Sequence, residues 1–339
     1  MEMTELRNEI RLALPSKGPL ALDALKLLEN AGLGVHKPNP RQYQATIPAL
    51  PGLSVLFQRA GDIVVSVRQG SVDFGVTGWD VVVERRGPDT DILVLYQDLG
   101  FGECSLTVIV PEDLPGVRQM SDLVAWQERL GRPLRVATKF PCTTRRFFAR
   151  HHLPDIQLIE AEGTLEIAPA IGYADLIVDL VSTGTTLRDN RLRILGDGLM
   201  VQSKACLIAN RKSLQGNPES LRYARYLLEF IVAHLRATVN VAIFANIRGA
   251  SPRRIAEQMF AKSVIGGLQG PTISPVITRQ NEDWYAVHII VPRDLLAQAI
   301  AELRDIGGSG VVVTPVTYIF EEEPPAYQAM IAALEDEGM

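Results

Sequence analysis

Carboxylate and hydroxyl side chains gather in one short stretch, YADLIVDLVSTGTTL, which runs from Tyr173 to Leu187. A strand-like apolar segment carries Asp175 and Asp179. The loop after it is predicted to open a helix, and it consists of Ser182, Thr183, Gly184, Thr185, Thr186 and Leu187. Hydroxyls, a glycine and free N–H groups at a helix N-terminus favour an anion. The pattern predicts a phosphate cradle, with upstream carboxylates for sugar hydroxyls or for Mg²⁺ held through water.

Ordinary structural roles compete with this interpretation. Acidic strands followed by Ser and Thr loops also arise as plain helix caps. Arg145 and Arg146 also suit a solvated helix face. Cys104 suits a small buried residue because nothing nearby in sequence would activate its thiolate. Trp79 suits a packing role, although an aromatic ring beside a Thr-Gly turn can also stack on adenine.

The length, composition and charge of the chain limit the classes of protein to which it can belong. The 339 residues suit two or three domains. Hydrophobic residues make up 47% and charged residues 22%, which indicates a globular chain. A net charge of -5 argues against nucleic acid as a partner, and no apolar run is long enough for a membrane span. Three scattered cysteines suit reduced thiols in a cytoplasmic protein, and no metal site with direct protein ligands is predicted.

Strand and helix patterns alternate along most of the chain, which predicts an α/β fold. We expect one lobe over residues 1–112, completed by about 206–236, and a second lobe with the phosphate loop over 113–205. A long amphipathic helix is predicted to end near Ala237. Residues 237–325 then show the order βαββαβ, which is typical of a ferredoxin-like domain.

Several motifs occur in the order found in one known family. They are LALPSKG, RAGDIVVSVRQGSVDFGVTGWD, DLGFGECSLTVIVP, VATKFPCTTRRFF and EIAPAIGYADLIVDLVSTGTTL. Together they resemble the ATP phosphoribosyltransferase family over nearly the whole chain. GPTISPV and the segment Leu303–Phe320 resemble the regulatory domain of its long form. The resemblance implies a two-lobed catalytic region like type II periplasmic binding proteins, followed by an ACT-like ferredoxin domain.

The resemblance also implies a Mg²⁺-dependent glycosyltransferase reaction at the start of histidine biosynthesis. Adenine N1 of ATP attacks C1 of phosphoribosyl pyrophosphate, and pyrophosphate leaves. Asp179 and the loop Ser182–Leu187 would bind the phosphoribosyl group together with Asp175, while Glu166 would lie near the sugar or pyrophosphate. The residues expected near ATP or pyrophosphate are Lys17, Gly18, Arg59, Asp62, Thr77, Gly78 and Asp80. Positive charge could also come from the segment that contains Lys139, Thr143, Thr144, Arg145 and Arg146.

The C-terminal domain implies histidine as a feedback inhibitor and a homo-oligomer, from dimer to hexamer. Thr272 is the expected effector contact, and oligomerisation alone is the plainer role of this domain. Inhibition at a distance requires different affinities for two conformations.

Three positions depart from the family pattern. Pro19 stands where the family usually has arginine, as do Trp79 and Glu103 in many relatives. Two alternatives therefore stay open at the level of sequence. One is a non-catalytic cytoplasmic ligand-binding or regulatory protein of the same fold, since fold does not imply catalysis. The other is a phosphoribosyltransferase for another nucleotide.

Overall fold

The computed structural model describes residues 9–39, 41–87, 91–160, 165–279 and 283–335. Contacts divide the chain into two compact units, one built mainly from residues up to 224 and the other mainly from residues 225–328. Within the described ranges, no helix is both long enough and apolar enough to cross a membrane.

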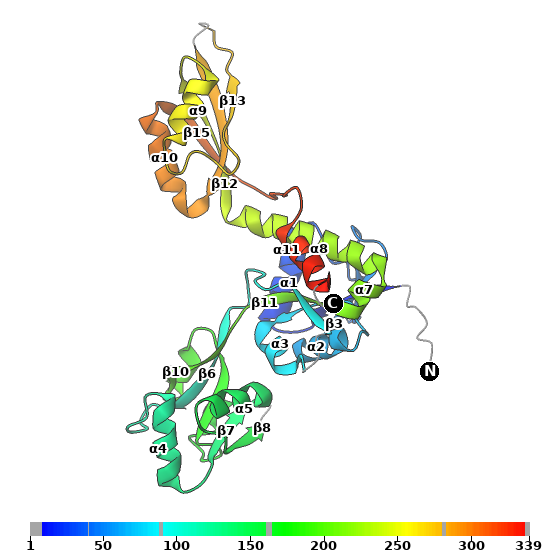
Figure 1. Ribbon diagram of the computed structural model, residues 1–339, viewed down its shortest axis with the longest axis vertical. Coiled ribbons are helices and arrows are strands. Elements are labelled where there is room, and N and C mark those ends of the chain that lie inside the picture. Colours follow the sequence, from blue (N-terminus) through cyan, green and yellow to red (C-terminus); the bar gives the residue numbers. More distant parts are fainter. Residues whose placement is uncertain (1–8, 40, 88–90, 161–164, 280–282, 336–339) are drawn as a thin grey trace. The chain divides into compact units, whose positions relative to one another are not determined.

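The first unit contains a six-stranded sheet in the order β2-β3-β1-β4-β11-β5. Figure 1 labels β3 and β11 of this sheet. Its strands are β1 (Ile10–Pro15), β2 (Gln44–Thr46), β3 (Leu53–Gln58), β4 (Phe74–Gly78), β5 (Ile92–Tyr96) and β11 (Ala205–Asn210). Strands β3, β1 and β4 run parallel, whereas β11 runs antiparallel to both of its neighbours. The helices of this lobe are α1 (Pro19–Asn30), α2 (Ala60–Arg68), α3 (Trp79–Arg85) and α7 (Arg211–Gly216). Ile63 and Val67 of α2 pack on the sheet beside Ile208.

A second sheet of the same unit has the order β10-β6-β9-β7-β8. Its strands are β6 (Cys104–Pro111), β7 (Leu134–Thr138), β8 (Ile156–Glu160), β9 (Leu176–Val181) and β10 (Leu192–Ser203). The helices around it are α4 (Met120–Leu130), α5 (Pro141–Arg150), the 3-10 turn η1 (Leu165–Ile167) and α6 (Thr185–Asp189). The chain crosses to this sheet between β5 and β6 and returns between β10 and β11. The expected two-lobed α/β region is therefore confirmed.

The N-termini of the helices follow local rules. One of these rules explains how the helix accommodates Pro19, which departs from the family pattern. Pro19 is the first residue of α1, where the N–H that proline lacks has no partner within a helix. Pro141 begins α5 in the same way. Asp122 accepts hydrogen bonds from the N–H groups of Arg118 and Gln119 and so caps α4. Pro19 is thus compatible with the helix, although it removes a cation.

The second unit holds a four-stranded sheet with the order β13-β14-β12-β15. The elements are β12 (Asn240–Arg248), α9 (Pro252–Phe260), β13 (Thr272–Pro275), β14 (Trp284–Pro292), the 3-10 turn η2 (Arg293–Leu295), α10 (Leu296–Asp305) and β15 (Gly308–Pro315). Their order is the expected βαββαβ, and the antiparallel strand order matches a ferredoxin-like sheet. Helices α8 (Pro218–Thr238) and α11 (Pro325–Glu335) precede and follow the domain.

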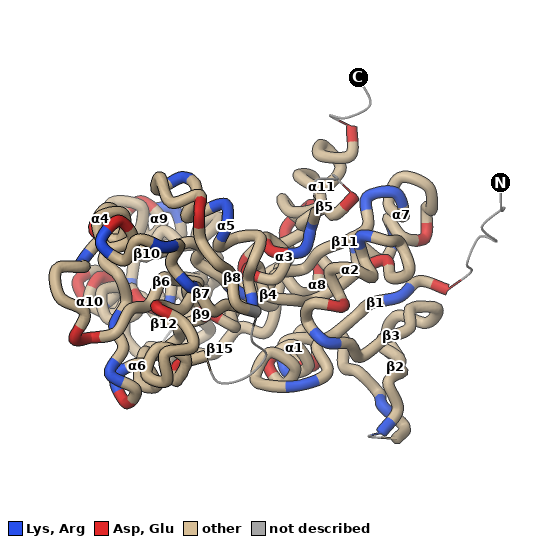
Figure 2. The backbone as a smooth tube through the Cα atoms, turned by 90° about the horizontal axis from the view of Figure 1, so that it is seen from below, with Lys and Arg blue, Asp and Glu red and all other residues tan. Residues whose placement is uncertain are grey.

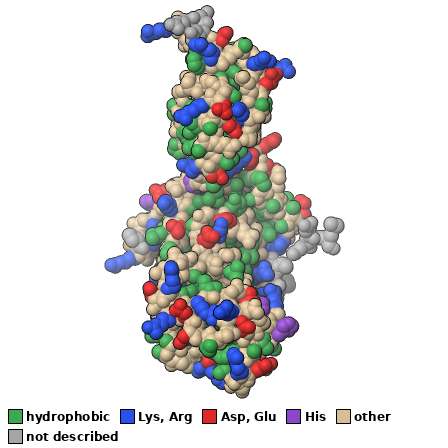
Figure 3. Space-filling model, turned by 90° about the vertical axis from the view of Figure 1, so that its left-hand side faces the viewer, with side chains coloured by type: hydrophobic (Ala, Val, Ile, Leu, Met, Phe, Trp, Pro, Cys, Tyr) green, Lys and Arg blue, Asp and Glu red, His purple; other side chains and the backbone are tan. Residues whose placement is uncertain are grey.

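One face of this sheet forms the core of the C-terminal domain. Ile255 and Met259 of α9 and Leu303 of α10 pack against the buried side chains of β12 and β14. Charged residues of both signs are interspersed along the traced chain in Figure 2, and they are scattered among hydrophobic side chains on the face shown in Figure 3. The face in Figure 3 therefore shows no extended basic stripe of the kind that binds a phosphate backbone.

Candidate functional site

The C-terminal edge of the second sheet gathers three residues that the sequence singled out. Parallel strands β7 and β9 end side by side, with Thr138 opposite Val178, so Lys139 follows one strand where Asp179 nears the end of the other. Burial raises the pKa of the half-buried Asp179, Lys139 lowers it, and Glu166 raises it. Both partners therefore lie close enough to Asp179 to affect its charge. The edge combines two carboxylates with one ammonium group.

The loop after β9 presents its hydroxyl groups to solvent. Ser182 and Thr183 are exposed, and Gly184 caps α6 in the left-handed region with φ 71°. Thr183 Oγ1 lies 3.3 Å from Thr185 Oγ1. Leu187 is buried and anchors α6 to the sheet. The loop is thus fixed at its apolar end, while its polar side stays free for an anion.

Thr107 is a further residue of this edge, and sequence patterns did not single it out. It lies directly opposite Asp179 in the antiparallel β6–β9 pair. Its side chain is 2% exposed, and its hydroxyl has no hydrogen-bond partner among the described residues. A buried hydroxyl without a partner is costly, so it is a candidate for contact with a bound group. Only strand pairing, which the local sequence does not specify, brings Thr107 to Asp179.

Asp175 lies at the other end of β9, away from the loop. Its carboxylate accepts hydrogen bonds from Arg132 at 2.6 and 2.9 Å and from Arg135 Nη2 at 2.8 Å. Although burial alone would raise the pKa of Asp175, these bonds hold it well below its usual range. Asp179 lies four positions after Asp175 along the extended chain, a distance of about 13 Å. The structure therefore does not bring Asp175 to the phosphate loop.

The first lobe places most of its predicted residues at one sheet edge. Strands β1 and β3 are parallel with Pro15 opposite Gln58, so the exposed Lys17 and Gly18 follow one strand where the exposed Arg59 follows the other. Asp62 is exposed in the first turn of α2. This edge therefore carries the cations Lys17 and Arg59 beside an exposed turn at Gly18.

Thr77, Gly78 and Asp80 form the turn between β4 and α3. Thr77 is buried and donates from its hydroxyl to Ala60 O at 3.1 Å. Asp80 is also buried, accepts a hydrogen bond of 2.6 Å from Ser203 Oγ and has a pKa raised by burial. A Cβ at Gly78 would collide with the Asp80 carboxylate, so the turn requires glycine. Thr77 and Asp80 therefore have partners within the protein. Gly78 is buried and closely packed in the same turn.

The second lobe also contacts the first through α5. The Glu84 carboxylate of α3 accepts hydrogen bonds from Cys142 N at 2.8 Å and Thr143 N at 2.9 Å. Arg146 donates to Val83 O at 3.0 Å. Thr143 and Thr144 are buried, whereas Arg145 is exposed. The predicted basic segment is therefore partly engaged in contact between helices.

A pocket of about 430 Å³ lies where the chain crosses between the two sheets. Its lining consists of Trp79, Gln97, Asp98, Glu103, Gln202, Ser203 and Lys204. Lys204 Nζ and Asp98 Oδ2 form an ion pair of 2.7 Å across it. Sequence reasoning missed most of these residues because they come from segments about a hundred positions apart.

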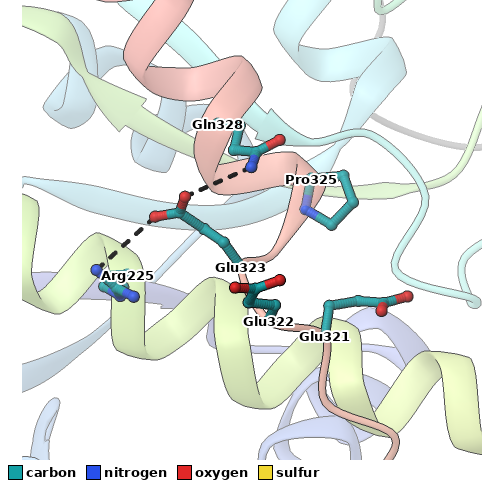
Figure 4. A pocket seen from close by; sticks show the side chains of 6 residues that line it. All are labelled: Arg225, Glu321, Glu322, Glu323, Pro325 and Gln328. Atoms are coloured by element: carbon teal, nitrogen blue, oxygen red, sulfur yellow. Dashed lines mark hydrogen bonds and ion pairs between the residues drawn. The ribbon is translucent and has the colours of Figure 1, made fainter.

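Two pockets belong to the second unit. One of about 370 Å³ contains Thr272, the expected effector contact, together with Arg236, His288 and Glu321. The other, of about 610 Å³, is shown in Figure 4 and is lined by Arg225, Glu321, Glu322, Glu323, Pro325 and Gln328. There Glu323 lies 3.8 Å from Arg225 and accepts a bond of 3.4 Å from Gln328. Those contacts tie the segment before α11 to α8.

Comparison with known proteins connects these features to one family. Residues 59–235 match the family described as "ATP phosphoribosyltransferase", and residues 237–318 match "HisG, C-terminal domain". The chain is 40% identical over 337 residues to the chloroplastic ATP phosphoribosyltransferase 2 of Arabidopsis thaliana, covering 97% of this chain and 81% of the relative. It is 34% identical to the ATP phosphoribosyltransferase of Rhodopseudomonas palustris strain HaA2, covering 95% and 98%.

A solved structure agrees at the level of fold. A chain of the ATP phosphoribosyl transferase (HisG:HisZ) complex from Thermotoga maritima aligns with a TM-score of 0.52 at 24% identity. The alignment covers 66% of this chain and 98% of that chain. Both family matches and the near full-length relatives lead to one conclusion: this chain belongs to the ATP phosphoribosyltransferase family, in the long form that carries the C-terminal domain.

Proposed function

We infer that this chain catalyses the first step of histidine biosynthesis, the joining of ATP to phosphoribosyl pyrophosphate. The lone pair of adenine N1 forms a bond to C1 of the ribose. The bond from C1 to the pyrophosphate oxygen breaks, and its electron pair leaves with pyrophosphate. The observation that carries this inference is family membership over nearly the whole chain, together with a carboxylate and hydroxyl-rich edge on the second sheet.

The phosphoribosyl group belongs at the C-terminal edge of β9. The loop Ser182–Leu187 binds the 5-phosphate through hydroxyl and backbone N–H groups, aided by the glycine turn at Gly184. Asp179 accepts hydrogen bonds from the ribose hydroxyls and stabilises positive charge as it develops on the sugar. The free hydroxyl of Thr107 faces the same position from β6. Asp175 supports this edge indirectly by fixing the start of the strand.

Magnesium fits the donor groups at this edge. Mg²⁺ is usually held by one or two carboxylates together with substrate phosphates and water. Asp179 and Glu166 supply two neighbouring carboxylates, and the described residues contain no cluster of three or more metal-ligating side chains. When bound with pyrophosphate, Mg²⁺ would neutralise charge on the leaving group. Asp179 and Glu166 would hold it through water, and Lys139 would supply a further positive charge.

The ATP side belongs to the edge of the first sheet. Lys17 and Arg59 place two cations beside the exposed Gly18 turn, where phosphates can approach the backbone closely. Asp62 lies on the first turn of the adjacent helix. Thr77, Gly78 and Asp80 shape the turn beside this edge. No side chain has to act as a nucleophile, because holding the two substrates in line is the main requirement.

Product analysis tests the proposed reaction. Purified protein is incubated with ATP, phosphoribosyl pyrophosphate and Mg²⁺, with pyrophosphatase to remove one product. We expect phosphoribosyl-ATP by mass spectrometry, and none when either substrate is left out. A folded protein that binds ATP or phosphoribosyl pyrophosphate without forming product would instead fit the non-catalytic binding protein.

Histidine is proposed as a feedback inhibitor that binds the Thr272 pocket. The lining contains polar Thr272 and His288 beside the ion pair of Arg236 with Glu321, and a zwitterion would exchange its two charges with that pair. We further propose a homo-oligomer, from dimer to hexamer, and a cytoplasmic location. The Arabidopsis relatives are named chloroplastic, and cell fractionation tests the compartment of this chain.

Inhibition curves test the effector proposal. We expect Thr272→Val to raise the histidine concentration for half inhibition severalfold while activity without histidine is kept. Ser309→Ala, on β15 of the same domain and outside the pocket lining, serves as the matched control. Inhibition that is unchanged in Thr272→Val and in a soluble chain truncated after Ala237 would show that the effector acts elsewhere.

A further inference from the structure

The pocket between the two sheets adjoins both proposed substrate edges. On one side, Ser105 of β6 pairs with Val181, the last residue before the phosphate loop. Glu103 precedes this pair by two residues and lines the pocket. The Ser105 hydroxyl donates to Gln202 Oε1 at 3.0 Å, which links the pocket lining to the same pair. A group held in the pocket is therefore next to the start of the phosphoribosyl loop.

The ATP edge reaches the pocket from the other side. A Cβ built at Gly102 would stand 3.0 Å from Leu20 Cδ1 of α1 and 3.4 Å from Ala205 N, so the crossing segment lies directly against the first turn of α1. Ala205 N donates to Phe101 O at 2.9 Å, and Leu99 N donates to Ala205 O at 2.9 Å. These bonds fix the crossing segments to each other beside the helix that follows Lys17 and Gly18.

Trp79 forms the aromatic wall of the pocket. It is half-buried and packs partly against the core of the first lobe, and its backbone N–H donates to Lys204 O at 2.9 Å. The backbone of Trp79 is therefore fixed and its side chain is packed on one side, while part of the residue remains accessible. A fixed aromatic ring stacks well on a nucleobase, because every base has a π-face.

The charged residues that line the pocket limit which ligands it can bind. Asp98 and Glu103 are acidic and Lys204 is basic, so these charged groups leave one net negative charge. Asp98 and Lys204 are already paired, whereas Glu103 and the amide of Gln97 have no hydrogen bond among the described residues. A phosphate chain is disfavoured by this lining. A neutral ring with an amino donor suits it, and 430 Å³ lies within the usual range for small-molecule sites.

We propose that this pocket holds the purine base of the nucleotide substrate, with Trp79 as the stacking wall and Glu103 as the acceptor for the exocyclic amino group. The inference rests on the proposed function and deepens it by naming the residues that select the base. Two departures from the family pattern, Trp79 and Glu103, line this one pocket. The base would then lie beside the loop that holds the ribose, as transfer to a ring nitrogen requires.

Nucleoside binding tests the proposal without turnover. In a full-length Trp126→Phe, Trp284→Phe background, Trp79 is the remaining tryptophan. We expect adenosine to quench its fluorescence in a saturable way, and ribose 5-phosphate to leave it unchanged. No saturable change with adenosine, in protein that still forms phosphoribosyl-ATP, would overturn the pocket assignment and leave the proposed function intact.

Kinetics give a second readout. Trp79→Leu keeps apolar packing but removes stacking, and we expect KM for ATP to rise on the order of tenfold with KM for phosphoribosyl pyrophosphate unchanged. Glu103→Gln should reduce the preference for ATP over inosine triphosphate, which carries a carbonyl in place of the amino group. Trp284→Phe is the matched control. Equal KM values for ATP in Trp79→Leu and the control would contradict the proposal, whereas lack of product in the unchanged chain would count against the proposed function alone.

Discussion

Asp175, directly before β9, and Asp179, near the end of β9, have opposite environments. Asp175 is bound by two arginines, and its pKa lies below the usual range despite burial. Asp179 has no arginine partner: burial raises its pKa and Glu166 raises it too, against smaller lowering effects of the Leu180 N–H and Lys139. The first carboxylate is neutralised by the fold. The second is compensated only in part, by Lys139 and the Leu180 N–H, at an edge that also has an exposed hydroxyl loop.

This difference separates a structural role from a chemical one. A group whose charge is satisfied within the protein contributes to stability, whereas a group whose charge is penalised is available to a ligand. The edge with Asp179 therefore has the features of a binding site, although both residues are aspartates on one strand. Substitutions at Asp179 and Asp175 test whether this distinction holds, and Glu84→Gln tests a carboxylate that contacts the other lobe.

The largest expected effect is on catalysis at Asp179. Asp179→Asn keeps the shape but removes the negative charge, so we expect the rate of phosphoribosyl-ATP formation to fall about 10²- to 10³-fold. Initial rates with saturating ATP measure this change. Asp175→Asn is the control and should keep most of the activity. Comparable losses in both variants would remove the distinction between the two ends of the strand.

The next effect is on stability at Asp175. Asp175→Asn leaves Arg132 and Arg135 without their anionic partner, and we expect the free energy of unfolding to fall by about 1–3 kcal/mol. Since the folded pKa is depressed, this stabilisation is present above the unfolded value near 3.9 and is lost as pH falls through the folded value. Urea unfolding at pH 7 and pH 3 measures both points. A loss of equal size at pH 3 would contradict the ion-pair explanation.

A smaller effect is expected at Glu84, which caps α5 from the other lobe. Burial raises the pKa of Cys142, and Glu84 raises it further. Glu84→Gln should lower the Cys142 pKa and give about 2- to 5-fold faster reaction with a disulfide reagent at pH 8. Peptide mass analysis identifies the labelled thiol. Glu128→Gln on α4 is the control, and identical labelling rates in the two variants would argue against this contact.

The smallest effect is a gain in stability at Asp179. Its raised pKa means that the charged form is disfavoured in the folded state, so the contribution of this group is present below the unfolded pKa and lost as pH rises through the folded value. Asp179→Asn should therefore raise Tm slightly at pH 7 and leave it unchanged at pH 3. A lower Tm at pH 7 would mean that the carboxylate is satisfied by the protein after all.

Local sequence patterns predicted much of the fold. Strand β1, the alternation of strands and helices and the βαββαβ order of the C-terminal domain all have local signals. Strand β10 does not, because its pairing with β6 shifts register between Ile194 and Leu199 and again before Val201. These shifts break the alternation of buried and exposed residues from which a strand is recognised.

The site was predictable only in part for a similar reason. The loop Ser182–Leu187 is contiguous, so its residue types indicate an anion site directly. The Arg132 partner of Asp175 lies 43 positions earlier, and Thr107 reaches Asp179 only through strand pairing. Which end of β9 serves a ligand thus depends on non-local contacts. The pocket between the two sheets depends entirely on non-local contacts, since Asp98 and Lys204 are 106 positions apart.

Titration with phosphoribosyl pyrophosphate and Mg²⁺, without ATP, is the most direct test that the C-terminal edge of β9 binds the phosphoribosyl group. We expect the unchanged chain and Asp175→Asn to bind with similar affinity by calorimetry, both measured where they are fully folded. Asp179→Asn and Thr185→Val should each bind at least tenfold more weakly. Undiminished binding in both of those variants would contradict the account and place the phosphoribosyl site elsewhere.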